Sequence, residues 1–130
     1  MNLLTLITKD IFSKGIPGEI YGFWQAHQIG GKLPWKTLFE PAIKMCREGF
    51  KVSKVLAFSI KRSEPWIRKD AEFSRSYINP VTNETFKEND IIKLPKLADT
   101  LAIISEENVT AFYGGSLTQT IVNEINSNGI

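Results

Sequence analysis

Apolar residues recur along most of the chain at the three- and four-residue intervals typical of amphipathic helices. The first pattern predicts a helix over residues 19–28, which the glycine pair at 30–31 ends. Its apolar face carries Ile20, Phe23, Trp24 and His27. A short turn over residues 35–39 is expected next, because Pro41 interrupts a longer helix and suits the first position of a new one. Gly49 then ends that helix in the left-handed conformation that glycine adopts readily.

A third helix is predicted after Ser53, whose hydroxyl can cap the first turn, and Pro65 is expected to break or kink it. Its apolar residues are Val55, Leu56, Phe58 and Ile60. Residues 66–93 are predicted to be irregular. Within them, residues 77–78 and 85–86 are predicted to pair as a small hairpin, because Asn-Pro and Thr-Asn turn signals lie between the two segments.

The clearest helical pattern begins at Pro95. One apolar stripe carries Leu94, Leu97, Ala98, Leu101, Ala102 and Ile104. After a short turn at residues 112–115, the last helix is predicted to begin with a capping box formed by Ser116 and Gln119. Gly129 is expected to end this helix. Its inner face carries Leu117, Ile121 and Ile125.

These elements predict a mainly α fold class with a small β-hairpin. The chain has 130 residues and no internal repeat, which allows one domain at most. A chain of this size buries about two thirds of its unfolded surface, and short helices need partners for their apolar faces. Several short helices without a dominant sheet are typical of a lobe of something larger, so we expect a fold that is not complete by itself.

Composition and charge change this picture little. The chain is 42% hydrophobic and 23% charged with a formal net charge of +2, which is ordinary for a globular protein and does not favour nucleic-acid binding. Residues 44–75 nonetheless hold nine basic side chains against four acidic ones. We interpret this stretch as a solvated helix face, with an anion-attracting surface as the alternative.

Two lone residues are the first candidates for chemistry. Cys46 is the only cysteine, so no internal disulfide can form, and its apolar helical surroundings favour a small buried hydrophobe over a nucleophile. His27 is the only histidine, and its place on an apolar helix face favours a structural role over catalysis. One histidine and one cysteine do not supply the ligand cluster of a metal site. We therefore predict no catalytic residue and no metal ligand.

The remaining polar patterns are unspecific. The glycine pairs at 30–31 and 114–115 lack the spacing of a phosphate-binding loop and are interpreted as helix stops. Neighbouring acidic residues are interpreted as solvated charges. These acids are Glu88 with Asp90 and Glu106 with Glu107.

Two sequons for N-linked glycosylation are present, at Asn83 (Asn-Glu-Thr) and at Asn108 (Asn-Val-Thr). This composition gives about one sequon by chance, so the pair does not establish a secretory route. Both lie in loop-like stretches. The apolar residues 1–10 lack a basic flank and a cleavage pattern, so no signal peptide is predicted, and no segment has the length needed to cross a bilayer.

Several stretches, in the same order, resemble the γ-glutamyltranspeptidase (glutathione hydrolase) family. Residues 15–27 are similar to its V-P-G-E-x-x-G-x-x-x-A-H segment, and residues 31–43 to G-x-L-P-W-x-x-L-F-x-P-A-I, after which Arg-Glu-Gly-Phe follows at 47–50. Residues 94–101 are similar to the family's L-P-x-L-A-x-T-L helix, and residues 111–117 to A-F-Y-x-G-x-L. The chain thus resembles an internal piece of the family's large subunit.

The resemblance covers residues 15–130 as a partial large-subunit domain and leaves residues 1–14 as an unmatched N-terminal segment. It implies a helical lobe of the αββα N-terminal-nucleophile hydrolase fold. The implied reaction cleaves the γ-glutamyl bond of glutathione and its conjugates and transfers the γ-glutamyl group to water or to acceptor amino acids and peptides. The implied partners are the rest of the large subunit and the small subunit, and no cofactor is implied.

The residues that perform the family's chemistry are not carried over. The family's nucleophilic threonine belongs to a T-T-H-like motif of the small subunit, and its substrate-binding arginine to an N-A-R-E-like motif upstream of the P-G-E segment. This sequence contains neither motif. We therefore expect an inactive scaffold and no substrate-binding residue. The alternative is a non-catalytic binding protein derived from the family. The resemblance also implies a glycosylated, membrane-associated or secreted parent that faces the cell exterior.

Overall fold

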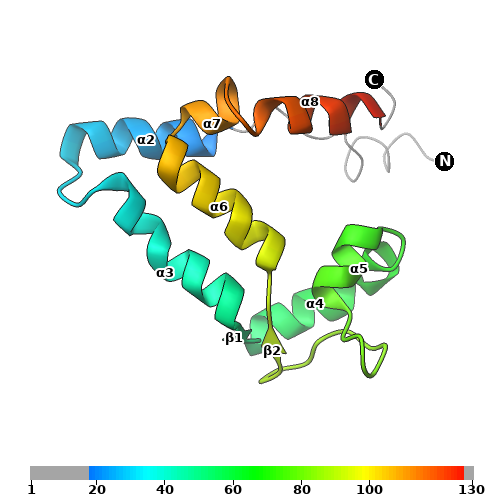
Figure 1. Cartoon of the computed structure of the whole chain (residues 1–130). Helices are drawn as coiled ribbons and strands as arrows, with labels where there is room; N and C mark the ends of the chain where they lie inside the picture. The colour runs from blue at the N-terminus through cyan, green and yellow to red at the C-terminus, as the bar shows by residue number, and fades with distance from the viewer. Residues whose placement is uncertain (1–17, 128–130) are drawn as a thin grey trace. The chain divides into compact units, whose positions relative to one another are not determined.

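The computed structural model describes residues 18–127, which form helices, two short strands and turns (Figure 1). The chain divides into two compact units, one comprising residues 1–39 with 102–130 and the other residues 40–101. Each unit is described by itself. The predictions that lie outside the described residues concern the N-terminal segment 1–14 and the helix end at Gly129.

The first unit is helical, and its aromatic and aliphatic side chains pack its helices together. Tyr21 and Tyr113 meet edge to face with ring centroids 6.1 Å apart, which places their two helices side by side (Figure 1). Ile104, Val109 and Ala111 are buried. The unit contains α2 (Glu19–Gly30), the beginning of α3 (Trp35–Glu48), the end of α6 (Pro95–Glu107), α7 (Thr110–Tyr113) and α8 (Thr118–Ser127).

The second unit combines two helices with a two-stranded sheet. Its core consists of Ile60, Ile67 and Ile78, against which Leu56 and Tyr77 pack. Burying each such aliphatic side chain contributes about 1.5–3 kcal/mol. The unit contains the end of α3, β1 (Phe50–Lys51), α4 (Lys54–Ile67), α5 (Ala71–Tyr77), β2 (Ile91–Ile92) and the beginning of α6.

The sheet joins two segments that lie far apart in the sequence. β1 and β2 pair in antiparallel fashion, with Phe50 opposite Ile92, and the Ile92 side chain is fully buried. The chain enters β1 through Gly49, whose φ of 100° is left-handed, as the sequence predicted. A Cβ at this position would lie 2.6 Å from Cγ2 of Ile91, so glycine is required both by its backbone and by this close approach.

Local capping explains where α4 and α5 begin. The Ser53 hydroxyl accepts a hydrogen bond from the Leu56 amide at 3.2 Å, which confirms the predicted cap of α4. The Asp70 carboxylate accepts bonds from the first-turn amides of α5 at 2.8 and 2.9 Å. The prediction that residues 66–93 are irregular is therefore wrong over α5, because a helix of seven residues is too short to show a clear apolar period.

The predicted helix start at Pro41 and the predicted break at Pro65 are wrong, whereas the alternative of a kink at Pro65 stays a prediction. α3 is one helix that contains Pro41, and the expected separate turn over residues 35–39 is its first part. α4 continues past Pro65 for one more half-turn. A proline inside a helix removes one hydrogen bond and costs about 3 kcal/mol.

The predictions for the C-terminal half are partly confirmed. Ile78 pairs with Thr85 in an antiparallel bridge, as the predicted hairpin requires. The capping box at Ser116 is wrong, because α8 begins two residues later and the Gln119 amide donates to Asn123 at 2.7 Å. Leu97 is 45% exposed and does not belong to the buried stripe of α6, whose most buried members are Ala98 and Ile104.

Candidate functional site

His27 lies in a cluster of aromatic rings in the first unit. Its ring stacks on Trp24 with centroids 6.2 Å apart and meets Trp35 edge on at 5.4 Å. Its Nε2 atom lies 2.8 Å from the carbonyl oxygen of Leu33. Because a carbonyl oxygen can only accept a hydrogen bond, Nε2 carries the proton in this contact. In the neutral ring the other nitrogen, Nδ1, is then a buried acceptor with no partner among the described residues. The geometry agrees with a structural role, tying α2 to the turn before α3.

Trp35 is the centre of the same cluster. Its ring lies edge to face with Trp24 at 5.1 Å and with Phe39 at 4.8 Å. Its indole Nε1 donates to the carbonyl oxygen of Ile104 at 3.1 Å, a bond between segments 69 residues apart. An ion pair between Lys36 and Glu106 lies beside it. The Glu106 side chain is 59% exposed, so the predicted solvated charge is confirmed, although it also pairs with a cation.

Cys46 is buried, with 6% of its surface exposed, and its thiol is free. Its carbonyl oxygen accepts a hydrogen bond from the Leu94 amide at 2.9 Å, which fixes the backbone beside the sheet. A nucleophilic thiol needs access to solvent and a neighbouring cation. The position therefore agrees with the predicted role of a small buried hydrophobe.

The basic stretch at residues 44–75 is largely neutralised by its own neighbours. Five of its nine basic side chains lie in ion pairs with carboxylates, and Lys69 lies 4.7 Å above the ring centre of Trp66. These contacts favour the solvated helix face over the anion-attracting surface. The five pairs are Lys44–Glu48, Arg47–Asp99, Lys61–Glu64, Arg68–Glu64 and Arg75–Glu72.

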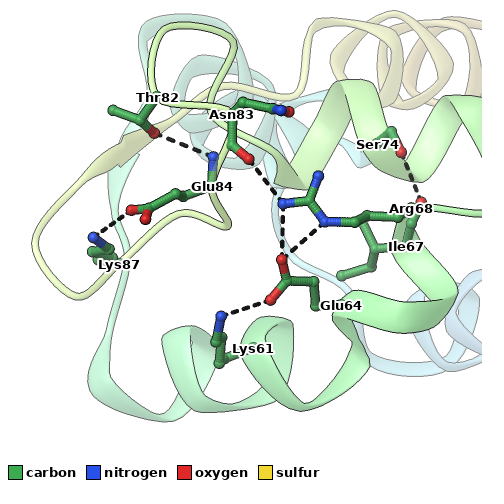
Figure 2. Close-up of polar contacts among 9 residues, drawn as sticks. All are labelled: Lys61, Glu64, Ile67, Arg68, Ser74, Thr82, Asn83, Glu84 and Lys87. Carbon is green, nitrogen blue, oxygen red and sulfur yellow. Dashed lines mark hydrogen bonds and ion pairs between the residues drawn. The ribbon is translucent and has the colours of Figure 1, made fainter.

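Glu64 is the centre of a polar network that fastens α4 to the turn at residues 79–84 (Figure 2). Its carboxylate accepts bonds from Lys61 Nζ at 2.7 Å and from Arg68 Nε at 2.9 Å. The same guanidinium donates through Nη2 to the carbonyl oxygen of Asn83 at 2.8 Å. The hydrogen bonds from Lys61 and Arg68 hold the pKa of Glu64 below its usual value.

An open apolar groove lies between α4 and α5. Its volume is about 340 Å³, and Trp66 and Phe73 on its walls are 41% and 56% exposed. A surface patch of this kind is typical of an interaction site. The lining residues are Leu56, Ser59, Ile60, Ser63, Trp66, Ile67, Phe73 and Tyr77.

The glycine pairs that the sequence singled out end helices, and Asp90, one of the acidic residues, closes a turn. α2 ends at Gly30 and α7 ends before Gly114, as helix stops require. Asp90 accepts a hydrogen bond from the Lys87 amide at 2.8 Å and so closes the turn before β2, rather than being only a solvated charge. Asn83 lies in the turn at 79–84 and Asn108 between α6 and α7. Within residues 18–127, no group of three or more His, Cys, Asp or Glu is placed to hold a metal ion.

Sequence reasoning missed the Glu64 network and the groove. The spacing of Lys61, Glu64 and Arg68 is a signal for helical ion pairs, because residues three and four apart are neighbours on a helix. The contact of Arg68 with Asn83 has no such local signal. The groove was not foreseen because six of its eight lining residues lie on α4 and the other two on α5, a helix that was not predicted.

Replacing Gly31 with alanine should destabilise the chain by about 1–3 kcal/mol, a typical cost of overpacking. A Cβ at Gly31 would lie 2.5 Å from the carbonyl oxygen of His27, whereas a Cβ at Gly30 would meet nothing within 4 Å. Gly30→Ala is therefore the matched control and should be neutral or stabilising by up to about 1 kcal/mol. Urea unfolding followed by tryptophan fluorescence measures both, and equal midpoints for the two variants would contradict the close approach at Gly31.

Stability should fall on acidification partly through Glu64. Its folded pKa lies below the ordinary value of 4.5, so its contribution is fully present above about pH 4.5 and is lost as the pH falls through the folded pKa. Glu64→Gln should therefore unfold more easily than wild type at pH 7, with a difference that shrinks below pH 4.5. Urea unfolding between pH 3 and 7 tests this, with Glu88→Gln as the control at an exposed glutamate. A difference that stays constant across this range would contradict the network.

Comparison with known proteins gives the chain its context. A model of the γ-glutamyltranspeptidase family matches residues 5–130, so the match begins within the segment 1–14 that the motifs left unmatched. Glutathione hydrolase 2 of Arabidopsis thaliana is 40% identical over 93% of this chain and 21% of its own length. Scoloptoxin SSD14 of Scolopendra dehaani is 37% identical over 95% of this chain and 22% of its own length. The chain spans about a fifth of the length of these curated relatives.

A solved γ-glutamyltranspeptidase, that of Helicobacter pylori, has the same fold over the matched part. The TM-score is 0.86 at 23% identity, and the match covers 95% of this chain and 36% of that one. The predicted fold class is confirmed: the chain is mainly helical with a two-stranded sheet and has the fold of part of that γ-glutamyltranspeptidase. Because the family model matches nearly its whole length, this chain belongs to the γ-glutamyltranspeptidase family.

Proposed function

We propose that this chain is part of a γ-glutamyltransferase/glutathione hydrolase, which cleaves the γ-glutamyl bond of glutathione and its conjugates. The γ-glutamyl group passes to water or to acceptor amino acids and peptides. The observation that carries this proposal is the family match over residues 5–130. Relatives that are named glutathione hydrolases, from Arabidopsis thaliana and Rattus norvegicus, support the substrate class.

Within such an enzyme, the proposed contribution of this chain is scaffold rather than chemistry. The thiol of Cys46 is buried, and the imidazole of His27 is bound to the Leu33 carbonyl. The two side chains best suited to act as nucleophile or base are thus engaged in packing. The nucleophile of the proposed reaction is the N-terminal threonine of a small subunit, with its own α-amine as base.

The proposal includes a parent enzyme that faces the cell exterior, either secreted or attached to a membrane. This part rests on the family resemblance. Among residues 18–127, no helix combines the length and the apolar character that crossing a membrane requires. The partners proposed for the chain are the rest of the large subunit and the small subunit.

The purified 130-residue chain should release no amine from a γ-glutamyl anilide above the rate in buffer, because the T-T-H-like and N-A-R-E-like motifs are absent from its sequence. The full-length Arabidopsis relative, assayed under the same conditions, is the positive control. Turnover by this chain that persists through a second purification step would overturn the proposed inactivity. Family membership would stand in either case, since it rests on the sequence match.

A second candidate function is that of a non-catalytic binding protein derived from the family. The open groove between α4 and α5 favours it, because Trp66 and Phe73 leave apolar surface available to a partner. The same groove could equally be covered by the remainder of a longer enzyme. The observation that separates the two is the reading frame of the transcript.

If the enzyme proposal holds, the mature transcript should continue in frame beyond Ile130 into a segment that bears the threonine of a small subunit. The physical reason is that the proposed reaction uses the N-terminal threonine of a small subunit as its nucleophile. Residues 1–130 contain no T-T-H-like motif that could supply this threonine. Sequencing of the full-length transcript measures this. A stop codon directly after Ile130 would instead support the binding protein.

A further inference from the structure

We propose that the groove between α4 and α5, with the exposed stripe of α4 beside it, is a docking site for an acidic amphipathic helix of a partner protein. Such a partner is the one that the second candidate function requires, and the proposal rests on that function. Three properties of the surface carry it: exposed apolar side chains, a positive edge and length. All of them belong to the unit of residues 40–101.

The apolar surface of α4 extends beyond the groove. Trp66 and Phe73 form the exposed walls of the groove itself. Val55 and Phe58, which lie earlier on α4, are 75% and 66% exposed. Residues three and four apart are neighbours on a helix, so Val55 adjoins both Phe58 and the groove residue Ser59. From Val55 to Trp66 this surface is about 17 Å long, at about 1.5 Å per residue, which suits contact with another macromolecule.

The acidic side chains nearest to the groove are already engaged. Glu64 belongs to the network that fastens α4 to the turn at residues 79–84 (Figure 2). The Asp70 carboxylate accepts the first-turn amides of α5. Glu72 pairs with two cations, one of them Lys96 at 2.6 Å. In the described part of the chain, no acidic side chain lines the groove, so none repels an acidic partner.

Two cations at the edge of the groove remain available to a partner. Arg62 precedes the groove residue Ser63 and lies one turn before Trp66. The Nζ atom of Lys69 lies 4.7 Å above the ring centre of Trp66. Within the described residues, neither cation makes an ion pair with a carboxylate. An apolar surface with a positive edge complements a partner whose apolar side chains are flanked by Asp or Glu.

A helix fits this surface better than other occupants do. A second copy of this chain, docked groove to groove about a twofold axis, would bring two positive edges together. A small molecule would stay largely exposed in an open groove, whereas ligand sites bury most of the ligand. An extended peptide needs an unpaired strand edge, which α4 and α5 do not offer. An amphipathic helix satisfies its own backbone and presents apolar side chains at matching intervals.

The test measures binding of synthetic peptides to the full 130-residue chain by fluorescence anisotropy. Each fluorescein-labelled peptide has about 17 residues, so that in helical form it is longer than the stripe. The first carries leucines at three- and four-residue intervals with flanking glutamates. The second replaces these glutamates with glutamine, and the third replaces the leucines with serine. The first should bind saturably, the second about tenfold more weakly at low salt, and the third not at all.

A charge reversal on the chain locates the binding. Arg62→Glu should weaken binding of the first peptide about tenfold at low salt and less at high salt, because salt screens exposed charges. Lys51→Glu is the matched control, since Lys51 is an exposed cation of β1 that does not line the groove. It should bind the peptide as wild type does. Circular dichroism checks that both variants keep their helices.

The outcomes separate this proposal from the functions above. Equal binding of the glutamate and glutamine peptides, or equal weakening by Arg62→Glu and Lys51→Glu, would overturn the acidic partner and leave a binding protein in place. Binding of no peptide would overturn the proposal and remove the groove as support for the second candidate function. Sedimentation that shows dimers dissociated by Arg62→Glu would assign the groove to a second copy and overturn it as well. The enzyme proposal depends on the transcript and stands apart from each of these results.

Discussion

Among residues 18–127, ten apolar residues are buried, whereas fifteen large apolar side chains are exposed. The burial of apolar side chains by itself therefore stabilises few of the helices and strands. The buried set is divided between two units, and the largest fully buried side chains are those of Ile92 and Val52 beside the short sheet. Helices of seven to fourteen residues are marginal in water without tertiary support. The positions of the remaining elements therefore depend on hydrogen bonds and ion pairs at their ends.

Those end contacts act in a consistent way in both units. In the first, the Trp35 indole bonds to the Ile104 carbonyl while its ring packs on Trp24 and Phe39. In the second, Arg68 joins α4 to the turn that carries Asn83. In each contact, a planar side chain donates a hydrogen bond to a backbone carbonyl oxygen of a segment that is distant in the sequence. A hydrogen bond between neighbouring residues could not join these segments. The chain spans about a fifth of the length of the curated relatives that it matches.

Several side chains that the sequence singled out are engaged in local contacts. His27 bonds to the Leu33 carbonyl oxygen, Cys46 is buried, and five of the nine basic side chains at residues 44–75 lie in ion pairs. What stays open is a groove between α4 and α5 and an ordered turn that displays Asn83.

The sequence by itself determined the features that depend on nearby residues of the chain, together with the family. The cap at Ser53, the left-handed Gly49 and the bridge between Ile78 and Thr85 were all predicted, because hydroxyl capping, glycine freedom and turn signals act locally. The motifs at residues 15–50 pointed to the family that the match over residues 5–130 shows.

Only the tertiary structure decided the rest. The pairing of Phe50 with Ile92 and the bond from Trp35 to Ile104 join segments that no periodicity relates. α3 is continuous through Pro41, against the local propensity of proline. The two sequons follow the same division: the sequence presents Asn83 and Asn108 alike, whereas in the structure Asn83 is exposed and Asn108 is half-buried and accepts a bond from the Thr110 amide. Local rules act through the backbone of a few residues, whereas these outcomes depend on which distant side chains share one space.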